Sequence, residues 1–199
     1  MKTNQFTKLF LITCAIAAAT GCASSPSRFY TLNSTATGDG ATPAVSYGVA
    51  VGPVSIPALV DRPQFMVQVA TNRIEVDEFN RWAEPLNNNI ARVIAGDLAA
   101  LLGTPQVATA PLANFNPAYR VSIDIQRFES VRGKSVLIEA VWVVHRTTPG
   151  GTTCSGRTIA SEPASGDSFD ALAAAHSRAL AKVSNDIAAV IRTETDAKP

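Results

Sequence analysis

The sequence predicts a single α/β domain in which two main amphipathic helices pack against a mixed β-sheet. Hydrophobic residues make up 46% of the chain, which is ample for a buried core. Several segments alternate apolar and polar residues as half-buried strands do, and two others repeat apolar residues every three or four positions as helices do. Because neither helix can bury its apolar stripe alone, a sheet covered by both helices is the economical arrangement.

The first strands are predicted in the segments before residue 80. Residues 47–54 carry spaced valines and end among prolines, which are typical of a strand terminus or a sheet edge. Residues 64–70 alternate apolar and polar side chains, Asn72-Arg73 forms a turn, and residues 74–79 return. This pattern predicts a β-hairpin.

The first helix is predicted to begin near Pro85 and to end before Gly103. Glu84 and Pro85 suit a first turn, while Gly103 and Pro105 are typical of a helix end. One stripe of the helix is apolar, with Leu86, Ile90, Val93, Ile94, Leu98, Leu101 and Leu102. The opposite face is expected to carry the polar residues Asn87, Asn88, Arg92 and Asp97.

The second half predicts three meandering strands and a helix. Residues 119–126 alternate strictly, whereas residues 136–144 are almost continuously apolar and predict a strand covered on both faces. Residues 153–161 return after a Pro-Gly-Gly turn. A last helix is predicted after Asp167 or Ser168, either of which suits the N-cap. Its apolar stripe contains Leu172, Ala179, Val183, Ile187 and Val190.

The first 21 residues have the layout of a secretory signal. Lys2 and Lys8 precede a short apolar run, and small residues precede Cys22. The sequence Ala-Thr-Gly-Cys that ends at Cys22 resembles the lipobox of bacterial lipoproteins, in which the cysteine is acylated. An ordinary secretory signal before an incidental cysteine has a similar layout, but the position of Gly-Cys at the end of the apolar run favours lipidation. By resemblance to enterobacterial sorting, Ala23 favours the outer membrane.

The chain is therefore expected to comprise a signal peptide (1–21), a lipidated segment and flexible linker (22–46), a periplasmic domain (47–192) and a polar tail (193–199). The signal holds two of the 17 basic residues and none of the 16 acidic ones, which leaves a formal net charge of −1. This balance disfavours nucleic acid as a partner. After lipidation of Cys22 only Cys154 remains, so no internal disulfide is expected, and Cys154 is predicted to be a buried small hydrophobe.

Several segments resemble the PqiC family, the paraquat-inducible-type lipoproteins that are also called ABC-type transport auxiliary lipoproteins. The most specific are Asp61-Arg62-Pro63 and the stretch from Arg81 to Leu86. The segment Phe29-Tyr30-Thr31-Leu32 resembles the family's aromatic segment after the lipidated cysteine. The resemblance implies an outer-membrane lipoprotein that faces the periplasm. It also implies a docking or adaptor role beside a mammalian-cell-entry (MCE) domain protein that moves lipids or other apolar molecules between membranes. Self-assembly beside a ring-shaped partner is an expectation from analogy.

The candidate interaction residues are Arg62, Arg81, Trp82 and Glu84, because tryptophan and arginine dominate binding hot spots. A structural alternative is open for the same residues. In it, Trp82 packs at the corner between strand and helix, and Arg62 pairs with Glu84 to hold the loop.

No pattern in the sequence predicts catalysis, a metal or a cofactor. Gly133-Lys134-Ser135 looks like the end of a phosphate-binding loop, but Phe128 stands where that motif needs a glycine. His145 and His176 do not form a zinc-ligand spacing with Cys154, and His176 is predicted to lie in the core. A non-enzymatic protein is expected. Two alternatives to the adaptor are a lipid-binding carrier and a structural or assembly lipoprotein of the cell envelope.

Overall fold

The structure is a computed structural model that describes residues 25–38, 44–109 and 114–196. Its elements follow one another in the order β1 (Arg28–Tyr30), β2 (Val49–Ser55), β3 (Gln64–Ala70), β4 (Arg73–Trp82), α2 (Leu86–Leu102), β5 (Val107–Ala108), β6 (Tyr119–Val131), β7 (Ser135–Arg146), β8 (Thr153–Pro163) and α3 (Phe169–Asp196). The predicted α/β class with two main helices is confirmed.

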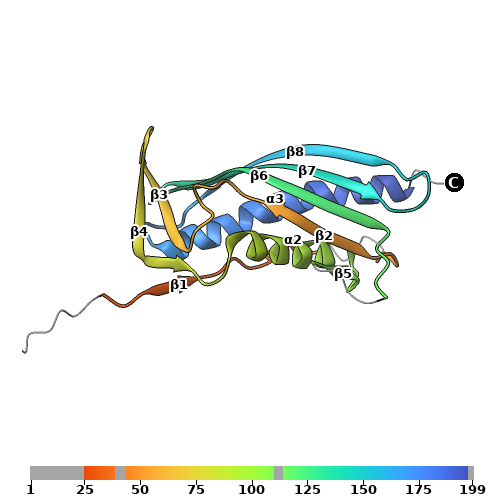
Figure 1. Ribbon diagram of the computed structural model, residues 1–199, viewed down its shortest axis with the longest axis horizontal. Coiled ribbons are helices and arrows are strands. Elements are labelled where there is room, and N and C mark those ends of the chain that lie inside the picture. Colours follow the sequence, from red (N-terminus) through yellow and green to blue (C-terminus); the bar gives the residue numbers. More distant parts are fainter. Residues whose placement is uncertain (1–24, 39–43, 110–113, 197–199) are drawn as a thin grey trace, which may run out of the picture.

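The strands form two sheets rather than the single sheet expected. The larger sheet has the order β5-β2-β6-β7-β8, and the smaller has the order β1-β4-β3. Strand β2 runs parallel to β5 and β6, while β6, β7 and β8 form an antiparallel meander. Helices α2 and α3 pack against each other and against the larger sheet, α2 on β2 and α3 on β7 and β8 (Figure 1).

The β3–β4 hairpin stands at one end of the molecule, and we call residues 64–82 the arm (Figure 1). Strand β1 pairs in parallel with the last three residues of the arm, Asn80 to Trp82. The segment that contains Phe29 and Tyr30 is therefore a strand. Asp77 interrupts the arm, because its Oδ1 accepts the backbone N–H groups of Phe79 at 2.9 Å and Asn80 at 2.8 Å. The register of the hairpin shifts at this point.

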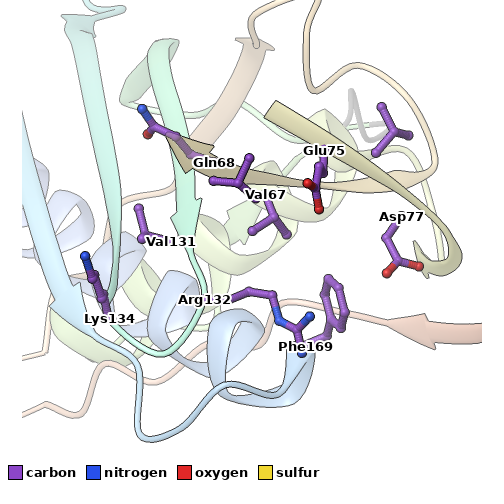
Figure 2. Close-up of a pocket in the computed structure, with 10 residues that line it drawn as sticks. Val67, Gln68, Glu75, Asp77, Val131, Arg132, Lys134 and Phe169 are labelled. Atoms are coloured by element: carbon purple, nitrogen blue, oxygen red, sulfur yellow. The ribbon is translucent and has the colours of Figure 1, made fainter. Parts of the chain in front are cut away.

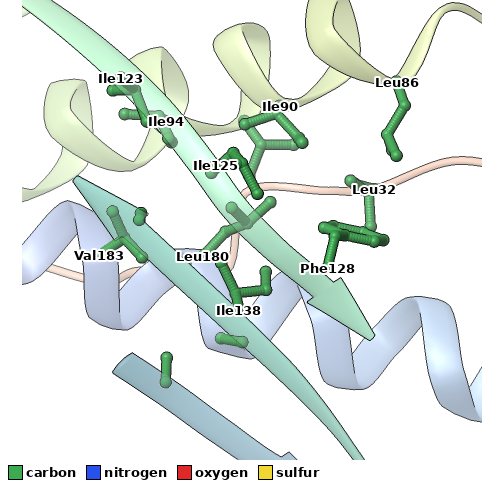
Figure 3. Close-up of a cluster of buried hydrophobic side chains, with 14 of the residues drawn as sticks. Leu32, Leu86, Ile90, Ile94, Ile123, Ile125, Phe128, Ile138, Leu180 and Val183 are labelled. Carbon is green, nitrogen blue, oxygen red and sulfur yellow. The ribbon is translucent and has the colours of Figure 1, made fainter. Parts of the chain in front are cut away.

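The core lies between the helices and the larger sheet (Figure 3). Ile90 and Ile94 on α2, Ile125 on β6, Ile138 on β7 and Leu180 on α3 are all at most 1% exposed. These contacts come from the apolar stripes and alternating strands that the sequence predicts.

The ends of α2 follow local sequence signals. Pro85 occupies the N-cap, and Gly103 adopts a left-handed backbone with φ 65°. Glycine reaches this conformation at little cost, so it closes the helix where the sequence predicts. At α3, the Oγ of Ser168 accepts the N–H of Ala171 at 3.1 Å, which makes Ser168 the capping residue of the two candidates.

Three expectations about the second half differ from the structure. Strand β7 alternates buried and half-buried residues, because the helices cover only one face of the larger sheet. Helix α3 continues to Asp196, so Thr193 and Glu194 are helical rather than part of a polar tail. Cys154 is only half-buried, and its Sγ donates to Glu194 at 3.2 Å, because it faces the last turn of this longer helix.

Candidate docking site

Trp82 lies in an aromatic cluster where the arm meets the body. Its ring stacks on Phe65 with 4.3 Å between the centroids, and its edge packs against Phe128 at 6.0 Å. Tyr30 and Phe169 contact Phe65 at 5.9 and 5.0 Å. Trp82 is only 5% exposed, so its ring holds the base of the arm and presents almost no surface to a partner.

The other three candidate residues lie near Trp82 in sequence but do not converge on it. Arg62 is exposed in the connection between β2 and β3. Arg81 donates its Nε to the backbone oxygen of Glu78 at 2.8 Å. Glu84 forms its ion pair with Arg92 on α2 rather than with Arg62. Helix α2 begins at Leu86 and brings Arg92 to Glu84, which explains why the alternative pair is not formed.

The N-terminal segment is clamped to the body through an asparagine side chain on α2. The Oδ1 of Asn89 accepts a hydrogen bond from the backbone N–H of Leu32 at 2.7 Å, and its Nδ2 donates to the backbone oxygen of Leu32 at 3.2 Å. Asn89 thus pairs with Leu32 as a neighbouring strand would. Leu32 is 0% exposed and Asn89 is 1% exposed, so this contact belongs to the core.

A second clamp is the buried carboxylate of Asp97 on α2. Its Oδ1 accepts the Oγ of Ser34 at 2.7 Å and the backbone N–H groups of Thr35 and Ala36, both at 3.0 Å. The Oγ of Ser184 on α3 lies 3.0 Å from its Oδ2. A carboxylate that is 0% exposed needs such partners, and this one has a donor for each oxygen.

The Asp97 clamp corrects two expectations about the sequence. Asp97 was expected on the polar face of α2, and residues 22–46 were expected to be a lipidated segment and flexible linker. Asp97 is buried because its seven-residue distance from Ile90 and four-residue distance from Val93 place it on the apolar stripe. The hydrogen bonds that it accepts hold residues 34–36 on the body. A polar residue at a stripe position was the signal that sequence reasoning missed.

Helix α3 adds a third contact to the same segment. The backbone N–H of Asn33 donates to the Oγ of Ser177 at 3.1 Å, and that hydroxyl donates to the backbone oxygen of Ala173 at 2.9 Å. Ser177 and Ser184 are also polar residues within a buried helix face. Together with Asn89 and Asp97 they join the N-terminal segment to both helices.

His176 lies in the core behind the aromatic cluster, as the sequence predicts. Its ring stacks on Phe128 at 3.8 Å, and its Nε2 lies 2.8 Å from the Oγ of Ser130. Burial lowers the pKa of His176 from 6.5 to about 3, because the charged imidazolium would lose its hydration. His176 is therefore a neutral core residue at physiological pH.

A surface pocket of about 330 Å³ separates the arm from the turn between β6 and β7 (Figure 2). Glu75 and Asp77 line it from the arm, while Arg132 and Lys134 line it from the turn. The guanidinium of Arg132 lies 5.0 Å from the centroid of the Phe169 ring, toward which it extends in Figure 2. The four charged side chains suit polar contacts rather than an acyl chain.

The proposed anchor, Cys22, lies outside the described residues. Among residues 25–38, 44–109 and 114–196, no helix is long and apolar enough to cross a membrane. The same residues contain no group of three or more His, Cys, Asp and Glu side chains that could hold a metal ion.

The fold and its clamps define a single-domain α/β protein whose N-terminal segment is part of its core. The family described as ABC-type transport auxiliary lipoprotein component matches residues 30–188, and the chain belongs to this family. The resemblance drawn from the Asp61-Arg62-Pro63 and Arg81–Leu86 segments is thereby confirmed.

Solved structures share the fold at low sequence identity. The protein XCC0632 from Xanthomonas campestris is 21% identical with a TM-score of 0.69, over 86% of this chain and 100% of that chain. An uncharacterized protein is 18% identical with a TM-score of 0.69, over 84% and 99% of the two chains. A PelC dodecamer from Paraburkholderia phytofirmans is 17% identical with a TM-score of 0.39, over 77% and 89%. No curated protein matches the chain.

Proposed function

We propose that this protein is a docking component of an envelope transport system, anchored through lipid on Cys22 to the outer membrane and facing the periplasm. Membership of the transport auxiliary lipoprotein family supports the general role. The observation that carries the proposal is the N-terminal segment, which Asn89 and Asp97 hold against helix α2 soon after the anchoring position. A tether joined to both helices transmits the position of the anchor directly to the domain.

The partner in this proposal is an MCE-domain protein, and the cargo of the whole system is lipid or another apolar molecule. The resemblance of the Arg62 and Arg81–Leu86 segments to the PqiC family supports this partner. Arg62 offers a solvent-exposed guanidinium group on the connection between β2 and β3, whereas Arg81 donates its Nε to the backbone oxygen of Glu78. Self-assembly of the protein beside a ring-shaped partner remains part of the proposal.

Docking is favoured over a carrier function by the lining of the pocket between the arm and the β6–β7 turn. Ligand sites for molecules of lipid size are apolar hollows that enclose most of the ligand. The pocket of about 330 Å³ carries four charged side chains. A second pocket of about 280 Å³ is lined mainly by apolar side chains, among them Met66, Ile74 and Phe128, and is where the alternative carrier function would have to act.

Site-specific photo-crosslinking in cells tests the proposed partner. A photoreactive residue replaces Arg62 in the full-length protein, with the exposed Ala189 on α3 as the control position. Capture of an MCE-domain protein from position 62 but not from position 189 is expected, and loss of that capture in a Cys22→Ala background would show that the anchor positions the protein. Capture of only cell-wall or outer-membrane assembly factors would instead support the structural alternative.

A further inference from the structure

Exposed apolar side chains gather at the arm end of the molecule. Among the described residues, seven large hydrophobic side chains are exposed, and only Ile159 on β8 lies away from this end. The other six lie on β1, on the connection before β3, and on the arm: Phe29, Leu59, Val69, Ile74, Val76 and Phe79. Such a concentration on a monomeric surface marks a contact with another apolar surface.

The lipid-bearing end of the chain enters the domain at the same place. Strand β1 begins at Arg28, six residues after Cys22. An extended chain spans at most 3.3–3.6 Å per residue, so the segment from Cys22 to Arg28, which we call the leash, reaches about 20 Å. The leash could lengthen only if β1 detached from the domain. Two contacts oppose this, because Tyr30 packs in the aromatic cluster and Asn89 holds Leu32.

The register of β1 and β4 directs two exposed phenylalanines outward. Tyr30 lies opposite Trp82, and both side chains are buried in the aromatic cluster. Phe29 lies opposite Arg81, on the other face, and is 64% exposed. Phe79 is two residues before Arg81 on the same strand and is 46% exposed. Alternation along a strand therefore places Phe29 and Phe79 on the outward face of the small sheet.

We propose that this outward face of the small sheet, with Phe29 and Phe79, lies on the lipid surface of the membrane to which the protein is anchored. The inference rests on the proposed lipidation of Cys22, which brings this end of the domain within about 20 Å of the bilayer. A leash of this length leaves little room for another protein between the arm and the bilayer. Aromatic side chains beside arginine are suited to the boundary between headgroups and acyl chains.

The contact gives the domain an orientation as well as an attachment. Acyl chains alone hold a protein on a flexible leash, whereas a second apolar contact fixes which side faces the lipid. The body then extends away from the membrane along the direction of the helices, because the arm stands at one end of them (Figure 1). The two ends of the body consequently present different surfaces to lipid and to periplasm.

Depth measurement with single cysteines tests the proposal. After acylation of Cys22, a Cys154→Ser substitution leaves no free thiol and preserves a hydroxyl beside Glu194. In this background, Phe29→Cys, Phe79→Cys and the control Ile159→Cys are each labelled with an environment-sensitive fluorophore. The full-length, processed protein is placed in vesicles of phosphatidylethanolamine and phosphatidylglycerol that contain a brominated phosphatidylcholine as an acyl-chain quencher.

We expect labels at positions 29 and 79 to be quenched by the brominated lipid at least about twofold more than the label at position 159, because interfacial side chains insert to the level of the acyl chains. Equal quenching at the three positions, with the labels at positions 29 and 79 open to aqueous iodide, would refute the contact. Shielding of these two labels from both quenchers would also refute it, because a protein or a second copy would then cover this face. Flotation of the vesicles reports anchoring separately, so a failure of lipidation is distinguished from a failure of the contact.

Discussion

Substitution of Asp97 tests whether the N-terminal segment is part of the folded domain. Asp97→Ala removes the acceptor for Ser34, Thr35 and Ala36 and leaves the buried Oγ of Ser184 without its carboxylate neighbour. Asp97→Asn is the matched control, because an amide oxygen accepts the same three donors and the amide N–H₂ can donate to Ser184. The two variants differ in how much of the clamp they remove.

The magnitude follows from the number and burial of the contacts. Hydrogen bonds to a charged group contribute about 1.5–3 kcal/mol each, but contributions of neighbouring contacts do not add. The donors at residues 34–36 lie near the surface and can bond to water once released, whereas Ser184 is 0% exposed and keeps only its bond to the backbone oxygen of Leu180 at 3.0 Å. We therefore expect Asp97→Ala to lower the free energy of unfolding by about 3 kcal/mol, and Asp97→Asn by about 1 kcal/mol, because only the charge is lost.

Urea denaturation followed by circular dichroism measures the two free energies of unfolding. Hydrogen exchange of the Thr35 and Ala36 amides provides the local readout, and both should exchange much faster in Asp97→Ala than in Asp97→Asn. A loss below about 1 kcal/mol for Asp97→Ala, with unchanged amide protection, would contradict the clamp, since even one charged hydrogen bond exceeds that value.

Three further predictions follow from the buried rings and the surface pair. The folded-state pKa of His176 lies below its ordinary value, so its contribution to stability is complete above pH 6.5 and is lost toward pH 3. Unfolding free energy should therefore fall by about 2 kcal/mol from pH 7 to pH 5, and His176→Phe should flatten this slope in urea titrations. Trp82→Ala should lower the free energy of unfolding by about 3–5 kcal/mol, because the stack on Phe65 is lost. An unchanged melting curve would exclude a structural role for the Trp82 ring. Glu84→Gln should cost less than about 1 kcal/mol, since the pair with Arg92 is solvent-exposed; a larger loss would contradict that assignment.

The elements of the fold were predictable where their signals are local. Pro85 and Gly103 bound α2 through backbone preferences that act within one turn. Strict alternation predicted β6, and Ser168 was one of two candidate caps for α3. The candidate docking residues were only partly predictable. Composition suggested Trp82 as an anchor, but it could not tell a ring in a core cluster from a ring on the surface.

The sequence by itself determined the class of fold, the bounds of α2, and a resemblance to the transport auxiliary lipoproteins. These depend on residue type and short spacing, which each segment carries alone. Only the tertiary structure decided that the N-terminal segment belongs to the core, since Leu32 meets Asn89 across 57 positions and Ser34 meets Asp97 across 63. Local patterns do not encode which distant donor a buried carboxylate will find. That choice is made when the helices and both sheets pack together and the polar groups left inside must be paired.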